Sequence, residues 1–232
     1  MEGLRAVVFD IGATLVEGPP VAPAKHIAAL VGTQDHRAVS NIIMCHDFSG
    51  SDALVDRLEK ELGVVFSEEA RQETERLWRS QFTACEELGG SSLVLRFFAE
   101  RSVKLALLSD IWRPYYEGVK RALPDIERLA PVRVLSFLTG CKKPDPHNFS
   151  LVCKELGEEP GRILMVGDTY SHDIEPAIAM GMKTCWLLRR PEKESRDVID
   201  VINRVKPAPD VTIGALAELA DDKLLDTIYK ER

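Results

Sequence analysis

Polar residues that follow short apolar runs are the residues of this chain best suited to chemistry. Asp10 comes directly after Val7-Val8-Phe9, and Gly12, two residues later, allows a tight turn. Ser109 follows the apolar run Leu105–Leu108. An aspartate held at the end of a strand can act as a nucleophile, and a serine hydroxyl can donate a hydrogen bond to a phosphoryl oxygen. Each motif alone is a weak signal, because acidic and hydroxyl residues often open loops in α/β proteins.

A pair of carboxylates and a lysine add the elements of an ion site. Asp168 and Asp173 follow the apolar run Ile163–Val166. Such a pair can converge on one hard cation, and carboxylate and water oxygens suit Mg²⁺ better than zinc or copper. Asp173 is also compatible with a helix N-cap, since helical residues follow it. Lys143, in a Lys-Pro-Asp-Pro segment, is a candidate counter-charge for a phosphate or for Asp10.

Short apolar runs alternate with helical patterns over most of the chain. The runs are Ala6–Phe9, Leu105–Leu108, Val132–Phe137, Ile163–Val166 and Thr184–Leu188. Such runs are typical of strands buried on both faces of a parallel sheet, and the helices between them predict a layered α/β domain. Reactive groups in these sheets collect at the carboxyl ends of the strands. Asp10, Ser109 and Asp168 are therefore expected to meet.

Residues 24–88 break this alternation, because only helical patterns are found there. One of these patterns is an apolar stripe over 70–88, which follows a helix start signal at Ser67. The Gly- and Pro-rich segments 18–23 and 89–90 flank the region like hinges. The pattern predicts an inserted helical domain; the alternative is a set of helices that simply covers the sheet.

Charge and composition exclude some classes of partner. The net charge of −7 argues against a nucleic-acid partner, since phosphate contacts need clustered Lys and Arg. The N-terminal apolar stretch Ala6–Phe9 is too short for a signal peptide or a membrane span. The five cysteines are scattered and form no CxxC pair, as in a reducing compartment. We expect a cytoplasmic protein with no membrane partner; the sequence indicates no oligomeric state.

Taken together, these motifs resemble those of the haloacid dehalogenase-like (HAD) hydrolase superfamily. That family has an Asp in a DxDGT-type loop, a Ser or Thr ending the second strand, a Lys before Pro and a GDxxxxD loop. This chain has, in the same order, Asp10, Ser109, Lys143, and Asp168 with Asp173. The resemblance covers nearly the whole chain. It implies a Rossmann-like α/β core, residues 1–17 and 91–232, with an all-helical cap domain, residues 18–90, inserted between the first two motifs.

The resemblance also implies a mechanism. Asp10 would attack phosphorus and form an aspartyl-phosphate in a Mg²⁺-dependent phosphatase that acts on a small phosphorylated metabolite. The phosphoryl oxygens would be held by Ser109 and Lys143. The metal would be held by Asp10, the backbone carbonyl of Gly12, Asp168 and Asp173. A divalent cation and a lysine are needed because the nucleophile and the phosphate are both anions.

Three positions depart from the family pattern. Family phosphatases have a second Asp two residues after the nucleophile, which protonates the leaving group and then activates water. Gly12 stands there and can do neither; losing a general acid–base costs about 10²–10⁴-fold in rate, or roughly 3–5 kcal/mol. Asp110 replaces a frequent Asn beside the serine, and Ala13 replaces the usual Gly.

Three interpretations of these departures stay open. Another group supplies the proton, for which His172, Tyr170 or a cap residue such as His46 are candidates. Alternatively, the protein is a dehalogenase- or phosphonatase-type hydrolase, classes that also lack the second Asp. Against this, dehalogenases need no metal, and the phosphonatase cap lysine motif is not recognisable around Lys25 or Lys60. In the third interpretation the domain binds a phosphorylated ligand or a protein partner and turns over negligibly.

Overall fold

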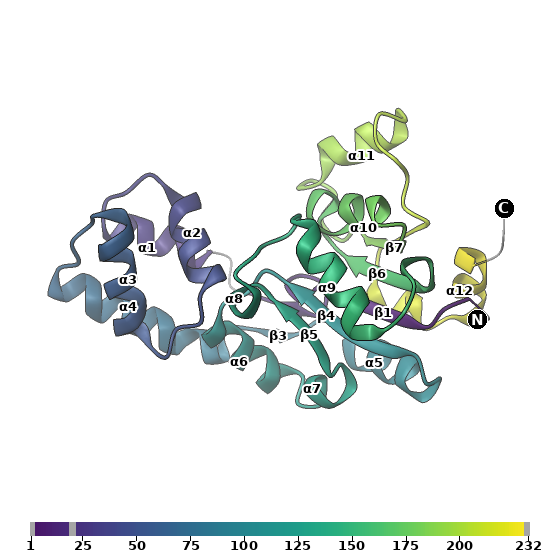
Figure 1. Ribbon diagram of the computed structural model, residues 1–232, viewed down its shortest axis with the longest axis horizontal. Coiled ribbons are helices and arrows are strands. Elements are labelled where there is room, and N and C mark those ends of the chain that lie inside the picture. Colours follow the sequence, from purple (N-terminus) through teal and green to yellow (C-terminus); the bar gives the residue numbers. More distant parts are fainter. Residues whose placement is uncertain (1–2, 19–21, 230–232) are drawn as a thin grey trace.

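The computed structural model describes residues 3–18 and 22–229, and a parallel β-sheet runs through its centre (Figure 1). Across the six-stranded sheet of the described residues the strand order is β5-β4-β1-β6-β7-β8, with every pair parallel. The strands are β1 (Ala6–Phe9), β4 (Lys104–Ser109), β5 (Val132–Leu135), β6 (Ile163–Gly167), β7 (Lys183–Leu187) and β8 (Val211–Ile213). The predicted α/β fold with a Rossmann-like parallel sheet core flanked by helices is confirmed.

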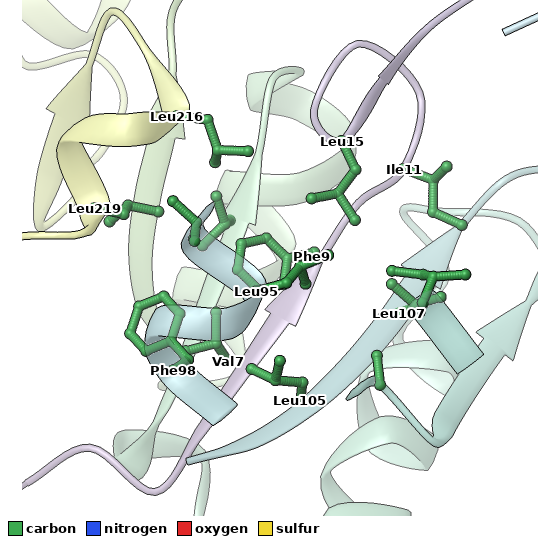
Figure 2. Close-up of a cluster of buried hydrophobic side chains, with 14 of the residues drawn as sticks. Val7, Phe9, Ile11, Leu15, Leu95, Phe98, Leu105, Leu107, Leu216 and Leu219 are labelled. Carbon is green, nitrogen blue, oxygen red and sulfur yellow. The ribbon is translucent and has the colours of Figure 1, made fainter. Parts of the chain in front are cut away.

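Helices cover both faces of the sheet, because successive side chains of a strand point to opposite faces. Val7 and Phe9 of β1 pack in a cluster with Leu95 and Phe98 of α5 (Ser91–Glu100), as Figure 2 shows. On the other face, Ala6 and Val8 pack in a cluster with residues of α9 (Pro146–Leu156). The strands are apolar on both faces for this reason, and the apolar runs therefore predicted them correctly.

A separate helical unit lies beside the sheet (Figure 1). It consists of α1 (Pro23–Leu30), α2 (His36–Cys45), α3 (Ser51–Leu62) and α4 (Glu68–Ser80). Together with Trp112 from the loop after β4, these helices bury a second hydrophobic cluster. Ser67 caps α4 as predicted, accepting a hydrogen bond from the Ala70 backbone N–H. The exact division into a core and a cap at residues 18–90 stays a prediction, and residues 19–21 of the expected hinge lie outside the described residues.

Two elements differ from the sequence-based expectation. The segment 24–88 is not purely helical, because β3 (Glu86–Glu87) pairs antiparallel with β2 (Val16–Glu17). The apolar stripe over 70–88 is not one helix either: α4 ends at Ser80 and a 3₁₀ turn, η1 (Gln81–Thr83), follows. A two-residue strand has no periodicity to detect, and its partner lies about 70 residues away in sequence.

The predicted run Val132–Phe137 also ends early as a strand. The chain turns into α8 (Ser136–Thr139) after Leu135, where the buried Ser136 hydroxyl bonds to the backbone of Ile111 in both directions. The hydrogen bonds between the Ser136 hydroxyl and the Ile111 backbone take the place of the strand-to-strand hydrogen bonds that would extend β5.

The remaining helices connect and cover the strands. They are α6 (Arg113–Ala122), α7 (Ile126–Leu129), η2 (Pro160–Arg162), η3 (Tyr170–Ile174), α10 (Glu175–Ala179), α11 (Ser195–Ile202), η4 (Leu216–Leu219) and α12 (Asp222–Tyr229). Helix α9 starts after the N-cap Asp145, whose side chain accepts a hydrogen bond from the His147 backbone N–H, and ends at Gly157 in the left-handed conformation. None of the helices within residues 3–18 and 22–229 is long and apolar enough to cross a membrane.

Candidate active site

The carboxyl ends of three adjacent strands bring the predicted site residues together. Asp10 follows β1, Ser109 ends β4, and Asp168 follows β6. Strand β1 pairs with both neighbours in a register that aligns the three ends, and this places the polar residues at one edge of the sheet. The expectation that these residues meet is confirmed, as the sheet rule for parallel strands requires.

Asp10 is buried, and its carboxylate accepts hydrogen bonds from three side chains. Its Oδ1 accepts hydrogen bonds from Lys143 Nζ at 2.7 Å and from Ser109 Oγ at 3.1 Å. Its Oδ2 accepts one from Thr14 Oγ1 at 3.1 Å, in the loop that follows β1. These contacts fix the carboxylate at the floor of a pocket. Thr14 was not singled out from the sequence, although a hydroxyl four residues after the aspartate is a signal that could have been read.

Lys143 is buried and lies between two carboxylates. Its Nζ donates to Asp10 Oδ1 at 2.7 Å and to Asp173 Oδ1 at 2.5 Å. Burial lowers the pKa of this ammonium group, but the nearby carboxylates of Asp10, Asp173 and Asp110 outweigh burial and raise the pKa. The lysine is therefore a permanent cation of the site, and the predicted counter-charge to Asp10 is in contact with it.

Three carboxylates form a cluster that suits a metal ion. Asp10, Asp168 and Asp173 each offer a carboxylate oxygen, and these oxygens lie within 4.8 Å of one another. Burial, followed by the charge of Asp10, raises the pKa of Asp168. Burial is also the main cause of the raised pKa of Asp173. Such groups stay ionised more easily beside a cation, and oxygen donors at this spacing fit Mg²⁺ in chemical type.

Asp173 does not cap a helix. It lies inside η3, and its Oδ2 accepts a hydrogen bond from the Thr169 backbone N–H at 3.0 Å, while its other oxygen meets Lys143. The N-cap alternative is wrong because the loop curls back on itself before α10 begins. Gly167 permits this, since a Cβ there would lie 2.4 Å from the Asp173 side chain.

Asp168 has a partner that the sequence did not indicate. The Arg190 guanidinium is in direct contact with its carboxylate, and the Trp186 Nε1 donates to its backbone carbonyl at 3.1 Å. Both partners come from β7 or the loop after it, the strand next to β6. No local pattern links these positions, which lie about 20 residues apart in sequence.

Asp110 lines the same pocket as Asp10 and also holds the segment that carries Lys143. Its Oδ1 accepts a hydrogen bond from the Lys143 backbone N–H at 2.8 Å, which holds the lysine segment against the loop after β4. Burial raises its pKa, whereas the charge of Lys143 lowers it. The replacement of the family's frequent Asn thus retains a hydrogen-bond acceptor.

Gly12 is exposed in the pocket, and the three candidate proton donors differ in their positions. His172 lines the same pocket as Asp10. Tyr170 is fully buried, and its hydroxyl donates to the Pro207 carbonyl at 2.6 Å. His46 contacts the Ile42 carbonyl and the Arg57 guanidinium through its two ring nitrogens and does not line this pocket. Of the three, only His172 has access to the site.

The pocket has a volume of about 480 Å³ and lies over the sheet edge. Its floor carries the charged residues described above. Its walls include the aromatic side chains of Trp112 and Tyr115, together with Met44 from α2. A volume of this size suits a small metabolite.

A parallel sheet with a carboxylate cluster, a buried lysine and a serine at its carboxyl edge defines a class of hydrolases. A family model described as a haloacid dehalogenase-like hydrolase matches residues 4–181. The chain belongs to the haloacid dehalogenase-like hydrolase family. The resemblance inferred from the motifs is thereby confirmed, and the protein is a hydrolase.

Several characterised proteins are similar to this chain. A glyceraldehyde 3-phosphate phosphatase of Pyrococcus abyssi is 26% identical over 202 residues, which cover 79% of this chain and 81% of the relative. The pyrimidine 5'-nucleotidase YjjG of Escherichia coli is 32% identical over 87 residues, 37% of this chain and 35% of the relative.

Solved structures with the same fold include both phosphatases and a dehalogenase. CbbY of Rhodobacter sphaeroides, solved in complex with xylulose 1,5-bisphosphate, has a TM-score of 0.63 at 17% identity and covers 96% of this chain and 99% of its own. The L-2-haloacid dehalogenase of Xanthobacter autotrophicus has a TM-score of 0.59 at 17% identity, and the match covers 96% of this chain and 98% of the dehalogenase chain. At this identity they show the fold alone.

Proposed function

We propose that the protein is a Mg²⁺-dependent phosphatase that hydrolyses a small phosphorylated metabolite through an aspartyl-phosphate on Asp10. The observation that carries the proposal is the buried cluster in which Lys143 bridges Asp10 and Asp173 while Asp168 lies beside them. Three carboxylates opposed by Lys143 and Arg190 leave an excess of negative charge, which a divalent cation offsets. The phosphatase names of similar proteins support this class over a dehalogenase.

The chain's own groups account for substrate binding and the first step. Ser109 Oγ and Lys143 Nζ, both within 3.1 Å of Asp10 Oδ1, donate to the oxygens of the incoming phosphoryl group. An Asp10 oxygen then forms a bond to phosphorus as the bond to the leaving oxygen breaks, and the leaving oxygen takes a proton from His172, which lines the pocket. Asp10, the Gly12 carbonyl, Asp168 and Asp173 would hold Mg²⁺, which would supply charge neutralisation for the two anions.

Hydrolysis of the aspartyl-phosphate requires a base for water, and Gly12 supplies none. His172 is the candidate that lines the pocket, and we propose that it takes the proton from the attacking water. Water then adds to phosphorus, and the bond between phosphorus and the Asp10 oxygen breaks, releasing phosphate. Because no contact among the described residues holds His172 against Asp10, we expect this step to be slow. The helical unit, assigned to residues 18–90, is proposed as the cap that covers the pocket.

The substitution Asp10→Asn tests this proposal. A panel of phosphorylated metabolites is incubated with the wild type and the variant, with Mg²⁺ and with EDTA, and released phosphate is measured. We expect release by the wild type with Mg²⁺ only, and none by Asp10→Asn, whose amide is not a nucleophile. Equal release by the two proteins would refute the role of Asp10. Chloride release from a haloacid without metal would instead indicate a dehalogenase.

A further inference from the structure

The part of the pocket wall that the helical unit contributes has no charged side chain among the described residues: its lining residues are Gly18, Ala22, Pro23, Met44 and Gln81. Glu17, which precedes this unit, also lines the pocket, but its carboxylate is paired with Arg189. Trp112 and Tyr115 of the sheet domain extend this mostly apolar wall. A charged group on the leaving part of a substrate therefore finds no partner on that side.

Two basic residues on one turn also line the pocket. Arg190 and Lys193 both line the pocket, and the Lys193 backbone N–H donates to the Arg190 carbonyl at 3.0 Å. The turn is the connection between β7 and α11, and the neighbouring Arg189 anchors it by pairing with Glu17 of β2 at 2.9 Å. This pair ties the turn to β2, whose Glu17 also lines the pocket.

The cations of the pocket differ in what they already bind. Lys143 contacts two carboxylates, and Arg190 contacts Asp168. Lys193 is exposed, and no carboxylate within residues 3–18 and 22–229 lies within salt-bridge distance of its ammonium group. An exposed lysine is often merely solvated, but this one lines the same pocket as Asp10, so its charge is available to a ligand there.

We propose that Lys193, beside Arg190, binds a second anionic group on the leaving part of the substrate. The preferred substrates are then phosphate monoesters that also carry a carboxylate or another phosphate, with their carbon skeleton against the apolar wall. This inference rests on the proposed phosphatase function and specifies its substrate class. It follows from charge: the reacting phosphate occupies Ser109 and Lys143, and Lys193 is left for a second anion.

Matched pairs of esters with one skeleton test this inference. One pair is 3-phosphoglycerate and glycerol 3-phosphate, which differ in a carboxylate; the other is ribulose 1,5-bisphosphate and ribulose 5-phosphate, which differ in a phosphate. The two pairs distinguish which second anion is recognised. For each pair, the ratio of kcat/KM values is compared among the wild type, Lys193→Met and Lys223→Met. Lys223 lies in α12, outside the pocket lining, and its replacement removes the same charge.

We expect the wild type to favour the doubly anionic ester of at least one pair by about tenfold or more, the effect of one charge-assisted contact. Lys193→Met should lower that ratio about tenfold, mainly through KM, whereas Lys223→Met should retain it. Added salt should also reduce the wild-type preference, because an exposed charge is screened. A wild type with no preference in either pair, or a ratio unchanged in Lys193→Met, overturns the proposal.

Failure of the phosphatase function is separated from failure of this inference by binding measurements. The same esters are titrated calorimetrically, with Mg²⁺, into Asp10→Asn and into the double variant Asp10→Asn/Lys193→Met. If no ester is hydrolysed by the wild type but the doubly anionic ester binds Asp10→Asn more tightly in a Lys193-dependent way, the phosphatase proposal fails and the anion subsite stands. Equal affinity of the paired esters for both variants overturns the subsite.

Discussion

Replacing Gly12 by aspartate should restore the proton-handling group that family phosphatases have at this position. The structure accepts the change: a Cβ built on Gly12 meets no atom within 4 Å, and the residue is exposed in the pocket. Its backbone is not in the left-handed region that would strain a side chain. The new carboxylate would enter the pocket beside Asp10, where it can reach the leaving oxygen.

The expected gain follows from the missing step. A positioned general acid–base contributes about 10²–10⁴-fold to a rate, which corresponds to roughly 3–5 kcal/mol of barrier. Part of this gain is offset, because a further carboxylate joins Asp10 and Glu17 along the pocket and repels the phosphate. We therefore expect kcat for Gly12→Asp to rise by about 10²-fold or more, with a higher KM.

The assay measures phosphate release at saturating substrate and the fraction of aspartyl-phosphate in acid-quenched protein by intact mass. Wild type should accumulate the modified protein, whereas Gly12→Asp should not. Gly12→Asn is the matched control, since its amide has the same shape but transfers no proton, and it should stay as slow as the wild type. Equal kcat values for Gly12→Asp and Gly12→Asn would refute the reasoning, since proton transfer would then not limit turnover.

Two further predictions concern the buried charges. Lys143→Met leaves Asp10 and Asp173 buried without their shared cation, so the free energy of unfolding should fall by about 3–5 kcal/mol. The control is Lys142→Met at the neighbouring, half-buried position, which should cost less than about 1 kcal/mol. Equal losses of unfolding free energy in denaturant titrations of the two variants would contradict this prediction. Burial raises the pKa of Asp173 to about 7, so in the folded state this group retains a proton that the unfolded chain releases near pH 4. Its contribution to stability is therefore full below about pH 4 and is lost as the pH rises through 7. In EDTA, thermal unfolding of the wild type should show this decline between about pH 4 and 7, and Asp173→Asn should show less of it; parallel profiles would contradict the assignment.

Local sequence patterns determined the parallel strands and the main site residues. Apolar runs such as Ala6–Phe9 predicted strands because a strand buried on both faces has no polar alternation. The order of the motifs placed Asp10, Ser109 and Asp168 at strand ends, and the sheet rule then predicted that they meet.

The tertiary structure decided which other side chains share the site. Arg190 reaches Asp168 because β7 lies beside β6 in the sheet, and no local sequence pattern predicts the order of the strands. In the same way, His172 lines the pocket while His46 is held by its own helical unit. Asp173 contacts Lys143 and caps no helix, because the loop around it curls before α10. Periodicity reports whether a residue is buried, whereas its partner depends on how distant segments pack.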